Sequence, residues 1–197
     1  MSVSIRPRKL AGPWVAGYSL DKHTTSSRMV GHNAYGHPVF ETVRSPLGEL
    51  LYRLKNHGDE TVVPEIVETV AAFVASWRVH LDALVPVPPS NTTRKRQPVI
   101  AVAKALGDRL GIPCEMCVSK IKATAQLKDV FDYEKRTELL KGVFAVDERL
   151  SSGRRLLLID DLYRSGATVR VIARLLTTEG AARAVYLLTL TQTRKLV

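Results

Sequence analysis

LLLIDDLYRSGAT, the stretch from Leu156 to Thr168, carries the clearest structural signal in this sequence. Its four leading aliphatic residues are typical of a parallel strand that is buried on both faces. Two carboxylates, Asp160 and Asp161, follow where that strand is expected to end. A short Ser/Gly turn and the start of a helical pattern come next. The stretch therefore predicts a strand, an acid pair, a tight turn and a helix, in that order.

This arrangement predicts a site for a phosphorylated sugar. Backbone N–H groups of the turn and the N-terminus of the helix favour a phosphate, and Ser165 and Thr168 add hydroxyl donors. The carboxylates of Asp160 and Asp161 can accept from ribose hydroxyls or hold a hydrated Mg²⁺. The alternative is a parallel strand that simply ends in two acids and a tight turn. A Walker A loop is excluded, because the sequence has no Gly-Lys-Ser/Thr.

Strand and helix patterns alternate through the second half of the chain. This alternation predicts a parallel α/β sheet with right-handed crossovers, whose ligands bind outside the carboxyl ends of the strands. Asp160 and Asp161 fall at that edge. The expected strands are Ala83–Pro88, Ile112–Val118, Val143–Val146, Leu156–Ile159 and Ala184–Leu190, with helices over Val99–Leu110 and from Thr168 to Gly180.

The first 80 residues show a different pattern and are expected to form a small hood or cap over the ligand edge, with residues 81–197 as the α/β core. Two strands are predicted there, joined by a Gly/Ser/His/Asn-rich connection, and two helices follow them. These elements are Trp14–Leu20, His37–Thr42, Pro46–Lys55 and Pro64–Trp77.

Charge is the main compositional signal. The 197 residues carry 29 Lys and Arg against 19 Asp and Glu, a net charge of +10. A polyanionic small ligand explains part of this excess, and nucleic acid is the other explanation. The 6% aromatic content weighs against a base-stacking platform. No apolar run has transmembrane length and no signal-peptide pattern is present, so a cytoplasmic location is expected.

Cysteine and histidine give no metal signal. In a strand, Cys114 and Cys117 would point to opposite faces, and no second pair exists to complete a zinc site. Buried or half-buried free thiols are expected. His23, His32 and His37 have no zinc spacing and are expected in exposed loops.

The stretch from Leu156 to Thr168 resembles the phosphoribosyl-pyrophosphate (PRPP) signature of type I phosphoribosyltransferases. The resemblance implies a Mg²⁺-dependent transfer of a 5-phosphoribosyl group from PRPP to a nucleobase or other nitrogen acceptor, with release of pyrophosphate. Asp160 and Asp161 would then be the catalytic pair and hold Mg²⁺, directly or through water. Arg164 departs from the small residue that the family usually has there. The implied 5′-phosphate site is Arg164, Ser165, Gly166, Ala167 and Thr168.

The same resemblance implies a pyrophosphate loop and a mobile loop. The former would consist of Pro88, Pro89, Ser90 and Asn91, for which the alternative is an ordinary proline-rich connection ending in a helix cap. The latter would be the polar stretch 119–142, which is long for a connection and suits a lid. Its candidates to neutralise pyrophosphate, each alternatively a solvated surface residue, are Lys120, Lys122, Lys128 and Arg136.

Between about Leu47 and Gln192 the chain is most similar to ComF-type phosphoribosyltransferase-like proteins linked to bacterial competence. The similarity implies a type I fold, often a homodimer. Two departures weaken a DNA-uptake role: no zinc ribbon precedes Cys114, and TRKRQP replaces the usual Arg-Gly-Phe-Asn-Gln stretch at residues 93–98. An enzyme is the leading hypothesis. The alternative is a non-catalytic sensor of PRPP or nucleotides, or a protein that binds single-stranded nucleic acid. The shared marks are Leu54-Lys55, Gly58-Asp59, Pro86-Val87-Pro88, Thr124, Gln126, Arg136 and Lys141–Phe144.

Overall fold

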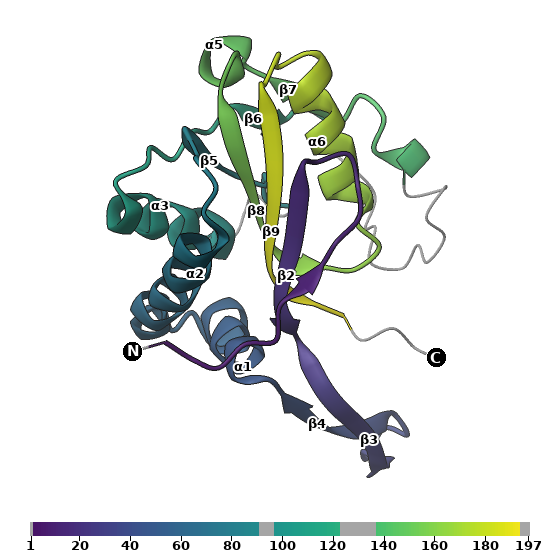
Figure 1. Ribbon diagram of the computed structural model, residues 1–197. Helices are drawn as coiled ribbons and strands as arrows, with labels where there is room; N and C mark the ends of the chain where they lie inside the picture. The colour runs from purple at the N-terminus through teal and green to yellow at the C-terminus, as the bar shows by residue number, and fades with distance from the viewer. Residues whose placement is uncertain (1, 91–96, 123–136, 194–197) are drawn as a thin grey trace.

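A five-stranded sheet forms the centre of the protein (Figure 1). The computed structural model describes residues 2–90, 97–122 and 137–193. The strand order is β1-β2-β9-β8-β5; all neighbours run parallel except β1 and β2, which are antiparallel. The predicted α/β class with a mostly parallel sheet is therefore confirmed. The strands are β1 (Arg8–Lys9), β2 (Ala16–Lys22), β5 (Ala83–Pro86), β8 (Arg155–Tyr163) and β9 (Ala184–Gln192).

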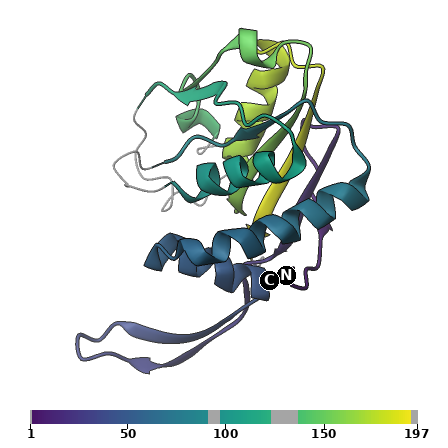
Figure 2. The ribbon, with the colours of Figure 1, turned by 90° about the vertical axis from the view of Figure 1, so that its left-hand side faces the viewer.

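Helices cover both faces of this sheet. Leu157 and Ile159 pack toward α1 (Pro46–Tyr52), α2 (Val63–Trp77) and α3 (Pro98–Leu110). Leu156 and Leu158 pack on the other face toward α6 (Ala167–Thr178). Because successive side chains of a strand alternate between faces, a strand covered on both sides requires an unbroken aliphatic run. Figure 2 shows α2 and α3 side by side on one side of the sheet.

The remaining elements are short. β6 (Val118–Lys120) pairs antiparallel with β7 (Phe144–Val146), and α5 (Glu148–Ser151) follows. A π-helical turn, η1 (Arg53–His57), continues α1, and a 3-10 turn, η2 (Glu60–Val62), leads into α2. No helix among the described residues has the length and apolar character needed to cross a membrane.

The cysteine-containing segment is not the strand that the sequence predicts. Cys114 forms an isolated bridge to Leu84, through the bonds Leu84 N–H to Pro113 O at 2.9 Å and Glu115 N–H to Leu84 O at 2.8 Å. The segment therefore touches the edge of β5 at one point. Cys114 is half-buried and Cys117 is buried, and both are free thiols.

The N-terminal strands also differ from the prediction. β2 joins the central sheet beside β9, so part of the expected hood belongs to the core. The polar connection is itself a strand, β3 (Thr24–His32), which pairs with β4 (Pro38–Arg44) in a hairpin that projects from the body (Figures 1 and 2). The Ser/Thr-rich sequence lacks an apolar alternation because both faces of the hairpin are largely exposed.

β8 is longer than its aliphatic run. The sequence predicts an end at Ile159, yet the strand continues through Tyr163, with Asp160 paired to Thr189 and Tyr163 to Gln192. The acid pair is thus inside the strand. The extension follows from β9, whose polar end supplies backbone partners that a hydrophobicity pattern does not reveal.

Candidate functional site

The turn between β8 and α6 has a backbone that only glycine adopts easily. Gly166 has φ of 77°, in the left-handed region. A Cβ at this position would also collide with the Tyr163 side chain. The first turn of α6 contains no acidic residue, and the Ser165 hydroxyl accepts from Ala167 N–H at 3.4 Å. The positive end of a twelve-residue helix therefore faces this turn.

Asp160 and Asp161 are both half-buried in β8. Asp160 Oδ1 accepts from the Asp161 N–H at 2.9 Å. Burial, and then the neighbouring charge of Asp161, raise the pKa of Asp160 to about 7. Adjacent strand residues point to opposite faces, so the two carboxylates lie in different surroundings.

Lys55 neutralises the second acid of the pair. Its Nζ lies 2.7 Å from Asp161 Oδ2, and the two side chains are 27% and 18% exposed. The π-helical turn that carries Lys55 ends at Gly58, whose φ is 64°. Leu54 is buried in the core beside it. Isolated π-helical turns occur often at functional sites, and here the turn places a cation against the acid pair.

A pocket of about 150 Å³ opens beside this ion pair. This is well above the roughly 10–15 Å³ that one water needs, so the pocket has room for a small anion. Its wall includes the start of α3, which has no acidic residue in its first turn and presents a partial positive charge. The described lining residues are Lys55, Val87, Pro89, Ser90, Gln97, Pro98, Val99, Ile100 and Asp161.

The structure therefore brings part of the predicted site together. Asp161, Pro89 and Ser90 line one pocket, although Asp161 belongs to β8 and the other two follow β5. Asp160 is adjacent to Asp161 in β8, and the turn residues 165–168 follow β8 directly. Arg164 is exposed and is not among the residues that line the pocket. The predicted Asn91 lies outside the described residues.

The lysines of the predicted lid are only partly described. Lys120 ends β6 and pairs with Phe144 of β7. Lys122 lies beside Gly142, where an added Cβ would be 3.4 Å from the lysine Nζ. Neither lysine is among the described lining residues of the pocket. Lys128 and Arg136 lie outside the described residues.

His23 lies close to the acid pair through Thr191, a position that the sequence does not reveal. It lies between β2 and β3 and is half-buried, whereas an exposed loop position was expected. Thr191 Oγ1 donates to Asp161 O at 3.1 Å and lies 3.3 Å from His23 Nδ1. Burial, and then Lys55 and Arg44, lower the pKa of His23. Since the Thr191 proton goes to the carbonyl, Nδ1 is the donor in the hydrogen bond between Thr191 and a neutral His23.

The donor set suits one kind of metal. Within the described residues, no group of three or more His, Cys, Asp or Glu side chains could hold an ion. Mg²⁺ differs from zinc in needing only one or two protein carboxylates when substrate phosphates and water supply the other ligands. The carboxylates of Asp160 and Asp161 are of the chemical type that such an ion takes; since they point to opposite faces of β8, a shared Mg²⁺ ion would need water between it and at least one of them.

No protein-family model matches this sequence, and no curated protein is similar enough to count as a relative. Among solved structures, the chain is similar to glutamine PRPP amidotransferase from B. subtilis, with 19% identity, a TM-score of 0.49, and coverage of 80% of this chain and 34% of that one. Adenine phosphoribosyltransferase from Saccharomyces cerevisiae is 10% identical, with a TM-score of 0.49; the match covers 84% of this chain and 84% of that one. Leishmania donovani UMP synthase is 15% identical, with a TM-score of 0.44; the match covers 84% of this chain and 28% of that one.

The chain thus spans 34% and 28% of the amidotransferase and UMP synthase chains. With TM-scores of 0.44 to 0.49, these likenesses assign neither a substrate nor an activity to it. The closer similarity to ComF-type proteins stays a prediction.

Proposed function

We propose that this protein is a phosphoribosyltransferase that binds PRPP and transfers its 5-phosphoribosyl group to a nitrogen acceptor. One observation carries the proposal: β8 holds two adjacent carboxylates, Asp160 and Asp161, and leads into a left-handed glycine turn at the positive end of α6. Phosphate binds favourably at such a helix N-terminus. The carboxylates belong to the strand that leads into this helix. A phosphorylated ribose has a phosphate for the helix N-terminus and hydroxyls for the carboxylates.

Each part of the ligand then has a defined place. The 5′-phosphate would bind at the turn from Arg164 to Thr168, and the ribose hydroxyls at Asp160 and Asp161. The pyrophosphate would bind in the pocket lined by Pro89 and Ser90, next to Pro88, at the start of α3. The lining of the pocket supports this division, since it includes Asp161, Pro89 and Ser90 but none of the turn residues 164–168.

Catalysis in this proposal comes from positioning and electrostatic stabilisation. The acceptor nitrogen attacks ribose C1, the bond from C1 to the pyrophosphate oxygen breaks, pyrophosphate departs, and the proton of the nitrogen passes to water. Positive charge develops on the ribose as that bond lengthens, and the acid pair offsets it. Mg²⁺, held by Asp160 and Asp161 directly or through water, would supply charge neutralisation for the pyrophosphate.

The test is release of pyrophosphate from PRPP and Mg²⁺ in the presence of a panel of nucleobases. We expect release that depends on one base and is lost in the double variant Asp160→Asn/Asp161→Asn. Asp108→Asn is a matched control, because it removes an exposed carboxylate on α3 that does not line the pocket. Absence of PRPP, ribose-phosphate and nucleotide binding in calorimetry would refute the proposal.

A sensor or nucleic-acid-binding protein is the second candidate. The net charge of +10 favours it, since a basic surface attracts any polyanion. Binding of PRPP without turnover on any base would support a sensor. Binding to single-stranded DNA that weakens steeply with salt would support the nucleic-acid role.

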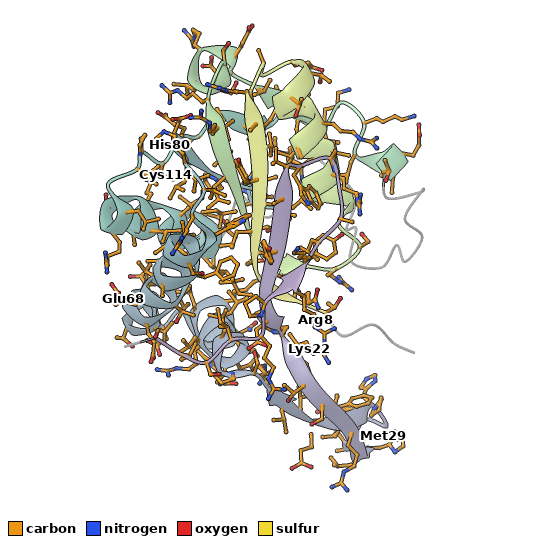
Figure 3. All side chains as sticks on the ribbon, in the orientation of Figure 1. Arg8, Lys22, Met29, Glu68, His80 and Cys114 are labelled. Atoms are coloured by element: carbon orange, nitrogen blue, oxygen red, sulfur yellow. The ribbon has the colours of Figure 1, made fainter. Side chains whose placement is uncertain are left out.

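We also propose a homodimer formed through the β3–β4 hairpin. Its exposed apolar side chains include Tyr35, Phe40 and Met29, which are 86%, 54% and 48% exposed, and Figure 3 shows Met29 on the projecting hairpin. A two-stranded hairpin is marginal alone. Among the described residues, neither outer edge pairs with another strand.

A second copy is the occupant that the charges favour. The Lys, Arg, Asp and Glu residues of the segment 24–44 are only two arginines and one glutamate. Of these, Arg28 pairs with Glu41 across the hairpin. Two chains of charge +10 meet with least repulsion at such a nearly neutral surface. Phe40→Lys should turn a dimer into a monomer in sedimentation velocity, whereas Val15→Lys, on the body, should not. A monomeric native protein would contradict this proposal.

A further inference from the structure

We infer that Lys55 is a pyrophosphate-binding residue that is held on Asp161 in the ligand-free protein and exchanges this carboxylate for the ligand. The inference rests on the proposed function, because it names a cation for the same anion pocket. Neither the signature in β8 nor the proline-rich loop contains this residue. It comes from the π-helical turn after α1, on a different part of the chain.

The geometry gives Lys55 two possible partners. Its Nζ is 2.7 Å from Asp161 Oδ2, and the same side chain lines the pocket with Ser90 and the start of α3. An anion in this pocket would therefore meet the ammonium group, a hydroxyl and a helix N-terminus together. The N-terminus of α3 thus shares this pocket with a lysine that comes from another element.

The exchange also resolves a conflict of charge. In the ligand-free protein, two adjacent carboxylates repel each other, and Lys55 lowers that cost by pairing with one of them. A pyrophosphate that brings Mg²⁺ supplies a new cation for the carboxylates and needs a cation of its own. A single lysine, whose compact charge sits on a flexible four-carbon stem, can serve both states with a small movement.

The anchoring of the turn favours movement of the side chain rather than of the backbone. Leu54 is buried, and the Arg53 guanidinium forms hydrogen bonds of 3.0 and 2.6 Å with Asp59. The Gly58 N–H donates to Arg53 O, which closes the turn. Lys55 is therefore presented from a fixed backbone position.

Calorimetry with inorganic pyrophosphate and, separately, ribose 5-phosphate tests the inference in Mg²⁺-free buffer. Loss of one charge-assisted hydrogen bond should weaken pyrophosphate binding by about tenfold or more in Lys55→Gln. Binding of ribose 5-phosphate should change less than binding of pyrophosphate, because its phosphate is held at the β8–α6 turn, which does not include Lys55, and only its hydroxyls reach Asp161, the partner of Lys55. Lys104→Gln is the matched control, since it removes an exposed lysine of α3 that does not line the pocket.

Asp161→Asn gives the distinguishing result. Without Mg²⁺, it frees Lys55 from its competing carboxylate, so pyrophosphate should bind more tightly than to the native protein. A simple structural role for the ion pair predicts the opposite, because both single variants would then weaken binding. Lys55→Arg should restore part of the pyrophosphate affinity.

The outcomes separate this inference from the proposed function. Unchanged pyrophosphate binding in Lys55→Gln, weaker binding in Asp161→Asn, or no pyrophosphate binding by the native protein would overturn the role of Lys55. Failure of the native protein to bind ribose 5-phosphate or PRPP would instead overturn the proposed phosphoribosyl site. Thermal melting of each variant, compared with the native protein, checks that the fold is retained.

Discussion

Replacing Asp160 by asparagine should stabilise the ligand-free protein. The pKa of Asp160 is raised to about 7 from its ordinary value of 3.8, chiefly by burial and then by Asp161. The charged carboxylate is therefore less favourable in the folded state than in the unfolded chain. Asparagine keeps the shape and the Oδ1 acceptor for the Asp161 N–H while removing the charge.

The sign of the pH dependence follows from linkage. Between about pH 4 and pH 7 the folded protein binds more protons at Asp160 than the unfolded chain does, so stability falls as the pH rises through this window. The full cost is present above pH 7. A rise of about three pKa units corresponds to about 4 kcal/mol. Because Asp160 and Asp161 titrate as a pair, we expect Asp160→Asn to gain only about 1 to 3 kcal/mol in unfolding free energy.

Urea unfolding in Mg²⁺-free buffer at pH 5 and pH 8 measures the effect. The gain in unfolding free energy for Asp160→Asn should be largest at pH 8 and should shrink toward pH 5. Asp161→Asn is the internal comparison. It relieves the same repulsion but breaks the 2.7 Å ion pair with Lys55, so its gain should be smaller. A destabilised Asp160→Asn protein at pH 8, or a gain that does not change with pH, would refute the reasoning.

Three further substitutions and reactions test the local physics. Gly166→Ala should cost about 1 to 3 kcal/mol in urea unfolding, because φ is 77° and the Cβ would meet Tyr163; an unchanged stability would contradict the turn geometry. Burial raises the pKa of the Cys117 thiol to about 11, so iodoacetamide at pH 8 should alkylate Cys117 more slowly than a free thiol until the protein unfolds, as mass spectrometry will show. Ser45→Ala should cost about 1 to 2 kcal/mol in thermal unfolding, since Ser45 Oγ accepts from Gly48 N–H at 3.0 Å and donates to Lys22 O at 2.6 Å; Ser76→Ala, which removes an exposed hydroxyl, is its control.

The sequence predicts the centre of the fold well because its strongest pattern is local. The run Leu156–Ile159 needs cover on both faces, and this demand alone implies helices on both sides of a parallel sheet. The true end of β8 at Tyr163 is not local information, since it depends on pairing with β9. The same holds for β2, whose neighbour in the sheet is far along the chain.

The candidate site is predicted only in part for a related reason. Asp161 lies near the carboxyl end of β8, and Pro89 and Ser90 follow β5, so the topology of a parallel sheet brings the three together. Lys55 lies in the turn after α1 and His23 between β2 and β3, where sheet topology does not predict which residues meet. A single lysine or histidine also forms no sequence motif that would mark it. The only sequence indication of Lys55 was its place in the pattern shared with ComF-type proteins.

The position of β2 constrains how the chain can fold during synthesis. β2 is made early, but its hydrogen-bonding partner β9 spans Ala184–Gln192. At about 5 to 20 residues per second, a ribosome needs roughly ten seconds or more to reach it. Until then the backbone groups of β2 that pair with β9 have no sheet neighbour on that side, and such unpaired strands are prone to aggregate. Truncated chains lacking β9 should therefore be captured by chaperones, and the acid pair should acquire its surroundings only when the last strand inserts between β2 and β8.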